Sequence, residues 1–527
     1  MNILISDQLA EEGIEILKSV KEFKVDCQYG KKPNELKKII KNYDALIIRS
    51  STQVTPDLIQ AAEKLKVIGR AGVGLDNVDL KAATKKGVVA MNTPAGNTTS
   101  TAEHTMSMIL ALSRNIPQAC ASLKAGKWDR SKFNGVELNR KTLGIIGLGR
   151  IGSTVARFAK SFGMRVIAYD PYLSVEVASQ MGVEIIELEN LLRTADFITI
   201  HIPKSVETKS LISEKEFNLM KKSVRIINCA RGGIIDESAL VKALEEGRIA
   251  GCALDVFEQE PLPPDSPLLK LDNCVVTPHL GASTSEAQVN VAIEIAESVR
   301  DALLGKRIRN AANFPSMSEE ASKVLEPYID LGERVGKFAG ELIRGRIAAV
   351  KVTYSGVMTK YNTIPMTMSL VYGALSPILG ENINPINAMD LARERAINVQ
   401  EIQSNKEEEF VNQISLEIKT GEETFSLWGT LSGNKQPRIV KVNKVYVEAI
   451  PDGFMLFINN NDKPGIVGAV GTVLAEDNIN IAGITFGRES RGGVAISVVN
   501  VDSEVPEKTL GKLRKHKDVL FVKFLEV

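Results

Sequence analysis

Short apolar runs alternate with amphipathic stretches from residue 1 to about residue 300. This alternation is typical of parallel α/β architecture, in which helices connect neighbouring strands. The runs form two series separated by a predicted helix at about 98–113, and a predicted helix at 285–304 would carry the chain back to the first series. We therefore expect two doubly wound domains that face each other across a cleft. The expected strands are 2–6, 45–49, 66–69 and 88–92 in the first series, and 142–147, 165–170, 197–202, 224–229 and 252–257 in the second.

The pattern changes after residue 315. Residues 317–450 begin with a helical stretch and then become rich in strands, with charged interruptions such as SNKEEEF at 404–410. From about residue 453 the pattern reads strand, helix, strand, strand, helix, strand, which is the ferredoxin-like order. We predict an α/β chain with two doubly wound, Rossmann-like parallel-sheet domains, an α+β intervening domain and a ferredoxin-like βαββαβ domain. The expected boundaries are 1–97 with 285–314, then 98–284, 315–450 and 453–527.

The composition narrows the possible partners. Lys plus Arg (65) nearly balance Asp plus Glu (64), so no global field attracts nucleic acid or an anionic membrane, and we expect neither as a partner. No uninterrupted apolar run reaches the roughly 20 residues of a spanning helix, and the start of the chain lacks the features of a signal peptide. The five cysteines are scattered without CxxC spacing, which predicts core packing in a reducing cytoplasm and no metal site.

A glycine-rich segment, GIIGLGRIG at 144–152, follows an apolar run and precedes a helical one. In a dinucleotide-binding loop Gly147 permits the tight turn, Gly149 lets the backbone approach a pyrophosphate, and Gly152 allows close helix–strand packing. The N–H groups of the following helix would bind the phosphates. Asp170, at the end of the next strand, would accept hydrogen bonds from the ribose and repel a 2′-phosphate. The segment predicts NAD rather than NADP; a structural turn with a helix-capping Asp170 is the alternative.

Three polar residues follow at predicted strand ends and loops: Arg231 in NCARGGIIDE, Glu260 in ALDVFEQEP and His279 in TPHLGAST. The carboxyl ends of parallel strands meet at the cofactor crevice, so these side chains would converge there. Histidine accepts protons near neutral pH, a carboxylate on its other nitrogen would fix its tautomer, and arginine holds a carboxylate bidentately. The set suits reversible hydride transfer on a 2-hydroxy acid. A capped loop histidine, a solvated carboxylate and a surface arginine are the alternatives.

Only three other histidines are present. His516 lies in the basic stretch KLRKHK and is expected on a solvated face. His104 follows Glu103 in the predicted helix between the two series, and His201 ends a strand without a carboxylate-bearing loop. The sequence therefore favours His279 as the base.

The segments GLGRIG, CARGGIIDE, ALDVFEQEP and TPHLGAST together resemble the D-isomer-specific 2-hydroxyacid dehydrogenases. The similarity includes IIRSSTQVT (47–55), VIGRAGVGLDNVDL (67–80), NTPAGNTTSTAEHT (92–105) and the stretch 126–147. It covers the whole chain and extends to a long form of the family with two C-terminal domains. The resemblance implies NAD-dependent oxidation of D-3-phosphoglycerate to 3-phosphohydroxypyruvate, the first step of phosphorylated L-serine biosynthesis.

The resemblance also implies roles for single residues. Arg231 would be the catalytic, carboxylate-binding arginine, with Glu260 and His279 as the acid–base pair. Asp255 would face the nicotinamide carboxamide, and Val73 would contact the cofactor where some relatives carry threonine. The implied cofactor contacts are Val73, Gly147, Gly149, Arg150, Ile151, Gly152, Asp170, Ile202, Cys229, Ala230, Arg231, Asp255, His279, Leu280, Gly281 and Ala282.

A phosphorylated substrate needs cationic donors away from the nicotinamide. Arg49 with Ser50 at one strand end suits this purpose, as does Arg70. The loop Gly72–Val73–Gly74 after Arg70 also offers backbone N–H groups as an anion nest. Each arginine is alternatively an ordinary surface charge.

Two further substrate contacts follow from the resemblance. Asn97 is similar to the substrate-contacting asparagine of the family. Arg130, in KWDR, is similar to an arginine that reaches the phosphate in the neighbouring subunit, with a solvated surface charge as the alternative. A homodimer or homotetramer would then be part of the site.

The segment 459–483, NNNDKPGIVGAVGTVLAEDNINIAG, resembles the start of an ACT domain. Asn460, Asp462 and Asn480 match positions that hold serine in relatives whose ACT domains pair edge to edge. The resemblance implies end-product inhibition by L-serine, transmitted through residues 317–450, where a second anionic effector would bind. A pure assembly module is the alternative.

Two other functions remain open at this point. A reductase of glyoxylate, hydroxypyruvate or another 2-keto acid would retain Arg231, Glu260 and His279, so only the phosphate-site arginines and the tail separate it. A corepressor-like NAD-sensing protein would bind the cofactor with little turnover, and it does not account for an ACT-like tail.

Overall fold

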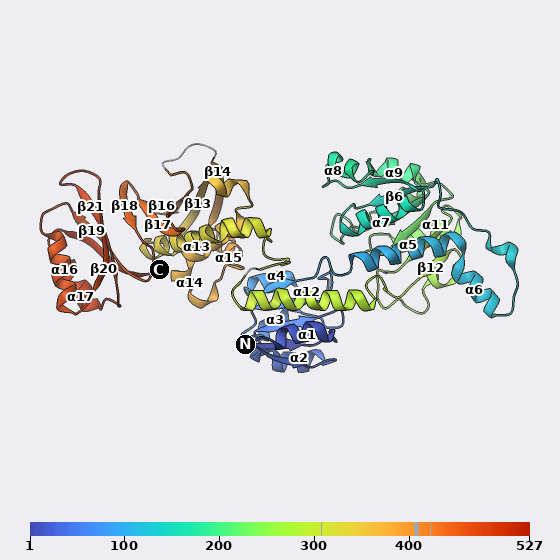
Figure 1. Cartoon of the computed structure of the whole chain (residues 1–527), viewed down its shortest axis with the longest axis horizontal. Helices are drawn as coiled ribbons and strands as arrows, with labels where there is room; N and C mark the ends of the chain where they lie inside the picture. The colour runs from blue at the N-terminus through green and yellow to red at the C-terminus, as the bar shows by residue number, and fades with distance from the viewer. Residues whose placement is uncertain (307, 405–409, 422) are drawn as a thin grey trace.

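The computed structural model describes residues 1–306, 308–404, 410–421 and 423–527. Most of the charged stretch expected at 404–410 lies outside these residues. Figure 1 shows the N-terminal α/β half of the chain (blue to yellow-green) and the mixed C-terminal half (yellow to red) as separate masses joined near α12 (Ser285–Leu303). No helix among the described residues is long and apolar enough to cross a membrane.

The first domain is a parallel sheet in the order β2-β1-β3-β4-β5 with helices on both faces. One face packs on α1 and α12, and the other packs on α2, α3 and α4. Its central strands are buried on both sides, which explains their continuous apolar runs. The bounds are β1 (Asn2–Ile5), α1 (Glu11–Lys18), β2 (Lys24–Cys27), α2 (Pro33–Ile39), β3 (Ala45–Ile48), α3 (Pro56–Ala61), β4 (Val67–Arg70), α4 (Leu80–Lys85) and β5 (Val89–Met91).

The second domain is a parallel sheet in the order β12-β11-β10-β9-β6-β7-β8. The strand order reverses between β6 and β9, and ligands of such sheets bind at the carboxyl ends beside that point. The expected doubly wound class is confirmed for both sheets. The strands are β6 (Thr142–Ile146), β7 (Arg165–Tyr169), β8 (Glu184–Ile185), β9 (Phe197–Ile200), β10 (Arg225–Asn228), β11 (Gly251–Leu254) and β12 (Cys274–Val276); the helices are α7 (Arg150–Ser161), α8 (Val175–Gln180), α9 (Leu188–Thr194), α10 (Glu214–Leu219) and α11 (Glu237–Glu245).

Three strands were not expected from the sequence: β2, β8 and β12. Each is short, each lies at the edge of its sheet, and β2 and β8 have no fully buried residue. A strand this short has too few apolar residues for its periodicity to be recognised in the sequence.

Two long helices connect the domains. α5 (Thr98–Arg114) carries the chain from the first domain to the second, and α12 carries it back, both close to the predicted bounds (Figure 1). After α5 the chain forms an arm, α6 (Ile116–Lys124) and the 3-10 turn Arg130–Phe133, which projects on the side away from the first domain and has no buried residue.

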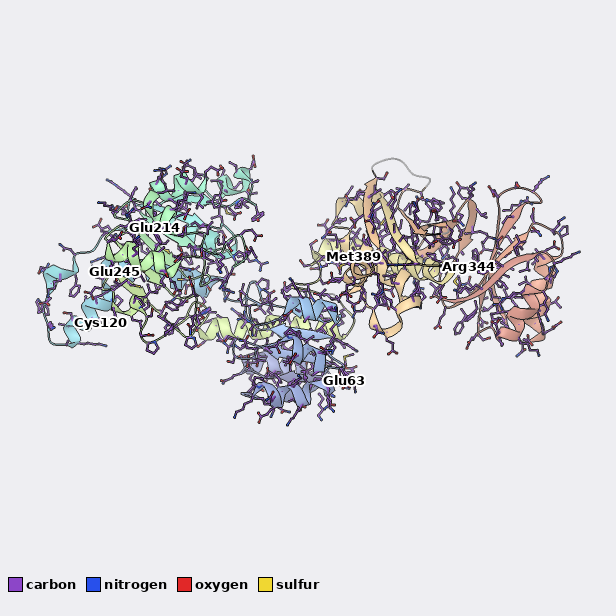
Figure 2. All side chains as sticks on the ribbon, turned by 180° about the vertical axis from the view of Figure 1, so that it is seen from behind. Glu63, Cys120, Glu214, Glu245, Arg344 and Met389 are labelled. Carbon is purple, nitrogen blue, oxygen red and sulfur yellow. The ribbon has the colours of Figure 1, made fainter. Side chains whose placement is uncertain are left out.

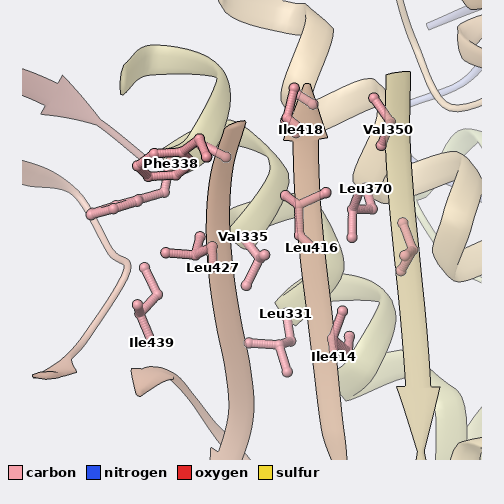
Figure 3. Packing of buried hydrophobic residues seen from close by; sticks show 14 of the residues in the cluster. Leu331, Val335, Phe338, Val350, Leu370, Ile414, Leu416, Ile418, Leu427 and Ile439 are labelled. Carbon is pink, nitrogen blue, oxygen red and sulfur yellow. The ribbon is translucent and has the colours of Figure 1, made fainter. Parts of the chain in front are cut away.

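The intervening region is a mixed sheet in the order β14-β13-β15-β16-β17-β18, with α13 packed across it. Figure 3 shows Leu331, Val335 and Phe338 of α13 facing Leu416 and Leu427 of the sheet. The bounds are α13 (Glu319–Leu342), β13 (Ile347–Ser355), α14 (Ile364–Leu379), α15 (Ala388–Glu394), β14 (Asn398–Ser404), β15 (Gln413–Thr420), β16 (Thr424–Ser432), β17 (Gln436–Val442) and β18 (Val445–Ala449).

Helix α14 departs from the expectation of a strand-rich region. Its sequence, IPMTMSLVYGALSPIL, is apolar on nearly every side and therefore lacks the amphipathic signal of a surface helix. Two glycines let α14 pack tightly against α13. A Cβ on Gly336 would lie 2.1 Å from the Leu370 carbonyl oxygen, and a Cβ on Gly373 would lie 2.1 Å from the Glu333 carbonyl oxygen, so a larger residue at either position would force the helices apart.

The C-terminal domain has the predicted ferredoxin-like order, with an antiparallel sheet β20-β21-β19-β22. One face of the sheet packs on α16 and α17. The other face joins the core of the intervening region, where the rings of Phe338 and Phe457 meet edge to face at 6.1 Å. The bounds are β19 (Phe454–Asn461), α16 (Ile466–Glu476), β20 (Ile481–Arg488), β21 (Val494–Val501), α17 (Glu507–Arg514) and β22 (Val519–Glu526).

The loop before α15 docks the intervening region onto the first domain. Ile386 is buried in the core that α1, α12 and the first sheet share. Beside it, Asn384 Nδ2 donates to the Gly87 carbonyl at 2.8 Å, and Lys85 forms a 2.8 Å ion pair with Glu394. The C-terminal half is therefore fastened to the domain that forms one wall of the cleft.

Candidate active site

The glycine loop has the geometry that its sequence predicts. Gly147 has φ +92°, which glycine adopts without strain. A Cβ on Gly152 would lie 2.1 Å from the Gly147 carbonyl oxygen, so the helix can approach the strand only without one. A Cβ on Gly149 would meet no atom within 4 Å, so the space above the N-terminus of α7 is open. This cradle fits a pyrophosphate.

Asp170 closes the loop from the end of β7. Its Oδ2 accepts a hydrogen bond from Leu148 N at 2.8 Å, and its Oδ1 accepts one from Tyr172 N at 2.9 Å. The carboxylate thus stands beside the glycine loop, where a ribose would follow the pyrophosphate. The other predicted cofactor contacts near the loop are Arg150 and Ile151 at the start of α7 and Ile202 after β9.

The predicted acid–base pair is assembled. His279 Nδ1 lies 2.7 Å from Glu260 Oε2, and Glu260 Oε1 accepts a hydrogen bond from Phe257 N at 3.0 Å. Burial raises the pKa of Glu260, but the hydrogen bonds from His279 and from Phe257 N outweigh it and leave this pKa below its ordinary value. Both side chains border a cavity of about 540 Å³ between the domains and an adjoining, mainly apolar cavity of about 740 Å³. The imidazole can therefore meet a ligand.

Arg231 reaches across the cleft from the second domain. Its Nε donates to Asp76 Oδ2 of the first domain at 3.1 Å, and its Nη1 donates to the Ala230 carbonyl at 2.7 Å. A Cβ on Gly74 would lie 2.1 Å from Arg231 Nη2, so the loop closes on the guanidinium only because residue 74 is glycine. The arginine, Glu260 and His279 border the same 540 Å³ cavity.

The opposite wall of this cavity is cationic. Arg49, Ser50, Arg70 and Asn97 border it, together with the loop 72–74. Burial and the neighbouring Arg231 lower the pKa of Arg70 to about 10. Within the described chain, Arg49 Nε, Arg70 Nε and Asn97 Oδ1 are buried without a hydrogen-bond partner. The two arginine Nε–H groups are donors, and a buried donor without a partner is costly, so an anion that accepts from both guanidinium groups would satisfy them.

Asp255 is buried behind the loop that carries His279, unlike the other polar residues, which border the cavity. Its side chain is 0% exposed, and its oxygens accept hydrogen bonds from Thr277 Oγ1 (2.6 Å), Leu280 N (2.7 Å) and Gly281 N (2.8 Å). Burial raises the pKa of Asp255, but hydrogen bonds from His104, Thr277 and Leu280 N lower it below its ordinary value. The carboxylate holds the loop that carries His279; its contact with the nicotinamide stays a prediction.

The remaining residues of the nicotinamide side lie around this loop. Ala230 N donates to Asn228 Oδ1 at 3.0 Å, and the Ala282 carbonyl accepts from Gln288 Nε2 at 2.8 Å. Burial raises the pKa of the Cys229 thiol to about 12, so this sulfur stays protonated. Val73, whose carbonyl accepts from Asn92 Nδ2, borders the cavity on the opposite wall.

His201 is excluded as the base by its surroundings. Burial lowers the pKa of His201 to about 3, and its Nε2 lies 3.0 Å from Thr199 Oγ1. An imidazole with so low a pKa is too weak a base to take a proton from an alcohol.

Arg130 is not brought to the cleft within one chain. It is exposed on the arm, and it is absent from the described residues that border either cavity. Figure 2 shows Cys120 of the same arm on the far side of the second domain from Glu63 of the first. The contact of Arg130 with a phosphate in a neighbouring subunit stays a prediction.

The three predicted effector residues do not meet within one chain either. Asp462 accepts from Arg488 Nη1 and from Gly492 N, both at 3.0 Å, at the end of β20. Asn480 precedes the start of β20 and donates to Asp502 Oδ2 at 2.6 Å. A strand of this length separates its ends by roughly 23 Å. Asn460 is 1% exposed, and its Oδ1 accepts from Ser497 Oγ at 2.9 Å.

Sequence reasoning missed three residues of the site. Asp76 lies in the quoted segment 67–80, but nothing in its spacing indicates that it pairs with Arg231. Lys204 follows β9 and borders the cavity, so the strand-end argument applied to Arg231 would have found it. His104 lies 3.1 Å from Asp255 Oδ1, although the sequence argument set it aside.

Comparison with known families matches three parts of the chain. Residues 106–281 match the NAD-binding domain of the D-isomer-specific 2-hydroxyacid dehydrogenases. Residues 324–443 match the D-3-phosphoglycerate dehydrogenase intervening domain, and residues 454–518 match the ACT domain.

Full-length relatives and solved structures agree with these matches. The chain is 45% identical over 516 residues to D-3-phosphoglycerate dehydrogenase of Methanocaldococcus jannaschii, covering 98% of both chains, and 40% identical over 525 residues to that of Bacillus subtilis, covering 100% and 99%. D-lactate dehydrogenase of Aquifex aeolicus, solved with NAD and lactic acid, is 31% identical with a TM-score of 0.54, over 60% of this chain and 100% of that one.

Proposed function

The chain belongs to the D-3-phosphoglycerate dehydrogenases, within the family of D-isomer-specific 2-hydroxyacid dehydrogenases, and on this premise we propose how its own residues perform the reaction. The enzyme oxidises D-3-phosphoglycerate to 3-phosphohydroxypyruvate with NAD, the first step of phosphorylated L-serine biosynthesis. In the proposed mechanism His279 takes the hydroxyl proton, Glu260 holds the imidazole, and Arg231 binds the substrate carboxylate.

The observation that carries this mechanism is the 2.7 Å contact between His279 Nδ1 and Glu260 Oε2 beside the interdomain cavity. A carboxylate only accepts hydrogen bonds, so Nδ1 carries the proton and Nε2 keeps its lone pair. Nε2 is then the atom that takes the proton from the C2 hydroxyl. The negative charge of Glu260 stabilises the imidazolium that forms.

Arg231 fits a carboxylate next to the reacting carbon, because its guanidinium offers parallel N–H donors in a fixed plane. Asp76 and the Ala230 carbonyl hold Nε and Nη1, which leaves Nη2 directed at the loop of residue 74. On the opposite wall Arg49, Arg70 and Asn97 are proposed to bind the substrate phosphate, with Ser50 and the N–H groups of Gly72 and Gly74 beside them.

NAD supplies the hydride acceptor when it is bound. We assign its pyrophosphate to the N-terminus of α7 at Gly149 and its adenosine ribose to Asp170. The Asp170 carboxylate would repel the 2′-phosphate of NADP. The predicted contacts of Val73, Ile202, Cys229, Ala230 and residues 279–282 belong to the same proposal.

We further propose that the working enzyme is a homo-oligomer, a dimer or a tetramer, in the cytoplasm. The arm exposes the apolar side chains of Ile116, Leu123 and Trp128 to water, and Trp128 is 81% exposed. Exposed apolar side chains that lie together often mark an interface with another chain. A second copy would cover these side chains and bring Arg130 to the neighbouring phosphate. All five cysteines, each within the described chain, are free thiols, which fits a reducing compartment.

L-serine is the proposed effector of the ACT domain. Because Asn480 and Asp462 lie at opposite ends of β20, a site that uses both requires two ACT domains side by side, with the ends of their strands adjacent. The proposal predicts that L-serine lowers the initial rate. An unchanged rate and unchanged NAD affinity with saturating L-serine would reduce the domain to an assembly module.

The catalytic proposal is tested by following NADH formation from D-3-phosphoglycerate and NAD. Replacing His279→Ala removes the base, so kcat should fall by at least about a hundredfold, the usual lower size of general acid–base assistance. The rate with D-glycerate, which lacks the phosphate, should be far lower than with D-3-phosphoglycerate in the unmodified enzyme. A near-normal turnover of the variant would remove His279 from its role.

A further inference from the structure

The segment that carries His279 needs support from its surroundings. His279 itself has φ +55°, in the left-handed region that non-glycine residues rarely adopt. Its N–H donates to the Thr277 carbonyl at 3.0 Å, which forms a tight turn. A turn of this kind persists only where neighbouring groups fix it.

Asp255 is the group that fixes this turn. One carboxylate accepts the Thr277 hydroxyl before His279 and the N–H groups of Leu280 and Gly281 after it. The segment 277–281, which we call the catalytic loop, is thus held on both sides of the histidine. Any rotation of the Asp255 carboxylate would move both anchor points and, with them, the imidazole.

His104 approaches the same carboxylate from helix α5. Its Nε2 lies 3.1 Å from Asp255 Oδ1 and 3.3 Å from Thr277 Oγ1, and its side chain is 18% exposed. Since the carboxylate only accepts, Nε2 must carry the proton and donate. The described residues that border the two cavities do not include His104, so it can affect the reaction only through its neighbours, of which Asp255 is the nearer.

The same helix holds the loop at a second point. The hydroxyls of Ser100 and Thr101 donate to the Gly281 carbonyl at 2.8 and 3.2 Å. Positions 100, 101 and 104 share one helix face. α5 begins directly after Asn97, which borders the cavity, so the helix connects the substrate wall to the catalytic loop.

We propose that His104 is a positioning residue: its Nε2–H orients the Asp255 carboxylate, which holds the catalytic loop and so places His279 toward the substrate hydroxyl. The proposal rests on the proposed role of His279. It assigns a task to the second histidine–carboxylate pair of the chain, which stands outside both cavities.

The kinetic test compares His104→Leu, which removes the donor, with His104→Gln, whose amide Nε2 can donate from nearly the same place. His104→Leu should lower kcat about tenfold and change KM for D-3-phosphoglycerate by less than about twofold, because the anion-binding wall is untouched. His104→Gln should keep kcat within about threefold of the parent. The matched control is Ser107→Leu, which introduces a leucine on the exposed face of the same helix.

A second measurement does not depend on turnover. The chain has only four histidines, so the imidazole signals of ¹⁵N-histidine-labelled enzyme are few, and His279→Ala identifies the signal of His279. We expect the His279 signals to shift or broaden in His104→Leu and to return to their original place in His104→Gln. If His104→Leu does not fold, His104→Ala removes the same donor without adding a branched side chain.

The outcomes separate the two proposals. A folded His104→Leu enzyme with unchanged kcat and unchanged His279 signals overturns the positioning role. Equal losses in His104→Gln and His104→Leu overturn it too, because they would indicate packing rather than a hydrogen bond. An unmodified enzyme that does not oxidise D-3-phosphoglycerate, but whose His279 signals respond to His104→Leu, supports the positioning role and overturns the proposed function.

Discussion

Two histidine–carboxylate pairs flank the same short loop, and they differ chiefly in exposure. In the pair Glu260–His279 the side chains are 37% and 49% exposed, and the contact measures 2.7 Å. In the pair Asp255–His104 they are 0% and 18% exposed, and the contact measures 3.1 Å. The same two chemical groups thus stand in two environments, one open to a ligand and one closed.

The comparison shows that a residue type does not by itself define a role. An exposed imidazole with one nitrogen bound to a carboxylate keeps the other nitrogen free for a substrate. The buried Asp255 carboxylate accepts four donors from its own chain, and these contacts hold the loop around it. We therefore expect changes at the open pair to alter turnover alone, and changes at the closed pair to alter both turnover and stability.

The largest effect should follow from Glu260→Gln. Loss of the charge that holds the imidazole and stabilises the imidazolium should lower kcat by roughly a hundredfold. The urea midpoint should stay close to that of the parent, because the pair is largely solvated. The control is Glu258→Gln, which changes a neighbouring carboxylate of the same cavity. Equal losses in both variants would mean that general cavity charge, and not the pair, sets the rate.

The next effect belongs to the closed pair. Asp255→Asn places an amide N–H among donors, so at least one buried N–H or hydroxyl loses its partner. Such a loss costs about 2 kcal/mol of unfolding free energy, measured by urea denaturation. Asp272→Asn, an exposed carboxylate just before β12, provides the matched control and should leave stability unchanged. A fully stable Asp255→Asn enzyme would contradict the anchoring role of the carboxylate.

The sequence predicts the open pair well and the closed pair poorly, for a physical reason. Glu260 and His279 follow strands of one parallel sheet, and the topology brings such strand ends together. His104 meets Asp255 through the packing of α5 on the sheet, and periodicity does not show which side chain of a helix face will touch which strand end. Its neighbour Glu103 is exposed and points elsewhere.

The same distinction applies to the fold. Alternating strands and helices predict both doubly wound sheets and the ferredoxin-like tail. The pattern does not predict α14, because this helix is apolar on nearly every side, or β8, because this strand has only two residues. The bridge between Asp76 and Arg231 depends on how two domains face each other, which no local pattern encodes.

A smaller effect is expected when the stability of the fold is measured at acidic pH. Burial raises the pKa of Asp255, and hydrogen bonds from His104, Thr277 and Leu280 N then lower it below its ordinary value of 3.8. A lowered pKa adds stability at pH values above the ordinary one, and this stability is lost as the pH falls through the folded-state value. The urea midpoint should therefore fall as the pH drops below about 5 in the parent, and fall less in Asp255→Asn. Identical slopes in the two proteins would contradict the contribution of Asp255.

The smallest effect should be the coupling energy of the open pair in folding. A double-mutant cycle with Glu260→Gln and His279→Ala, read by urea denaturation, should give less than about 1 kcal/mol, as expected for exposed ion pairs. The corresponding cycle with Asp255→Asn and His104→Leu, which removes the donor, should give a larger value, because that contact is buried. A reversed order would remove the distinction between the pairs.

The burial of Ile386 in the core of the first domain has a consequence for any shortened form of the enzyme. A chain that stops after residue 314 would lose the side chain that closes one end of that core, together with the bond from Asn384 to the Gly87 carbonyl. Water would then reach apolar side chains of the core that Ile386 shares with α1 and α12. Removing the two C-terminal domains therefore exposes part of the first-domain core, and an isolated N-terminal half should require a polar replacement on that surface before its kinetics are compared with those of the full chain.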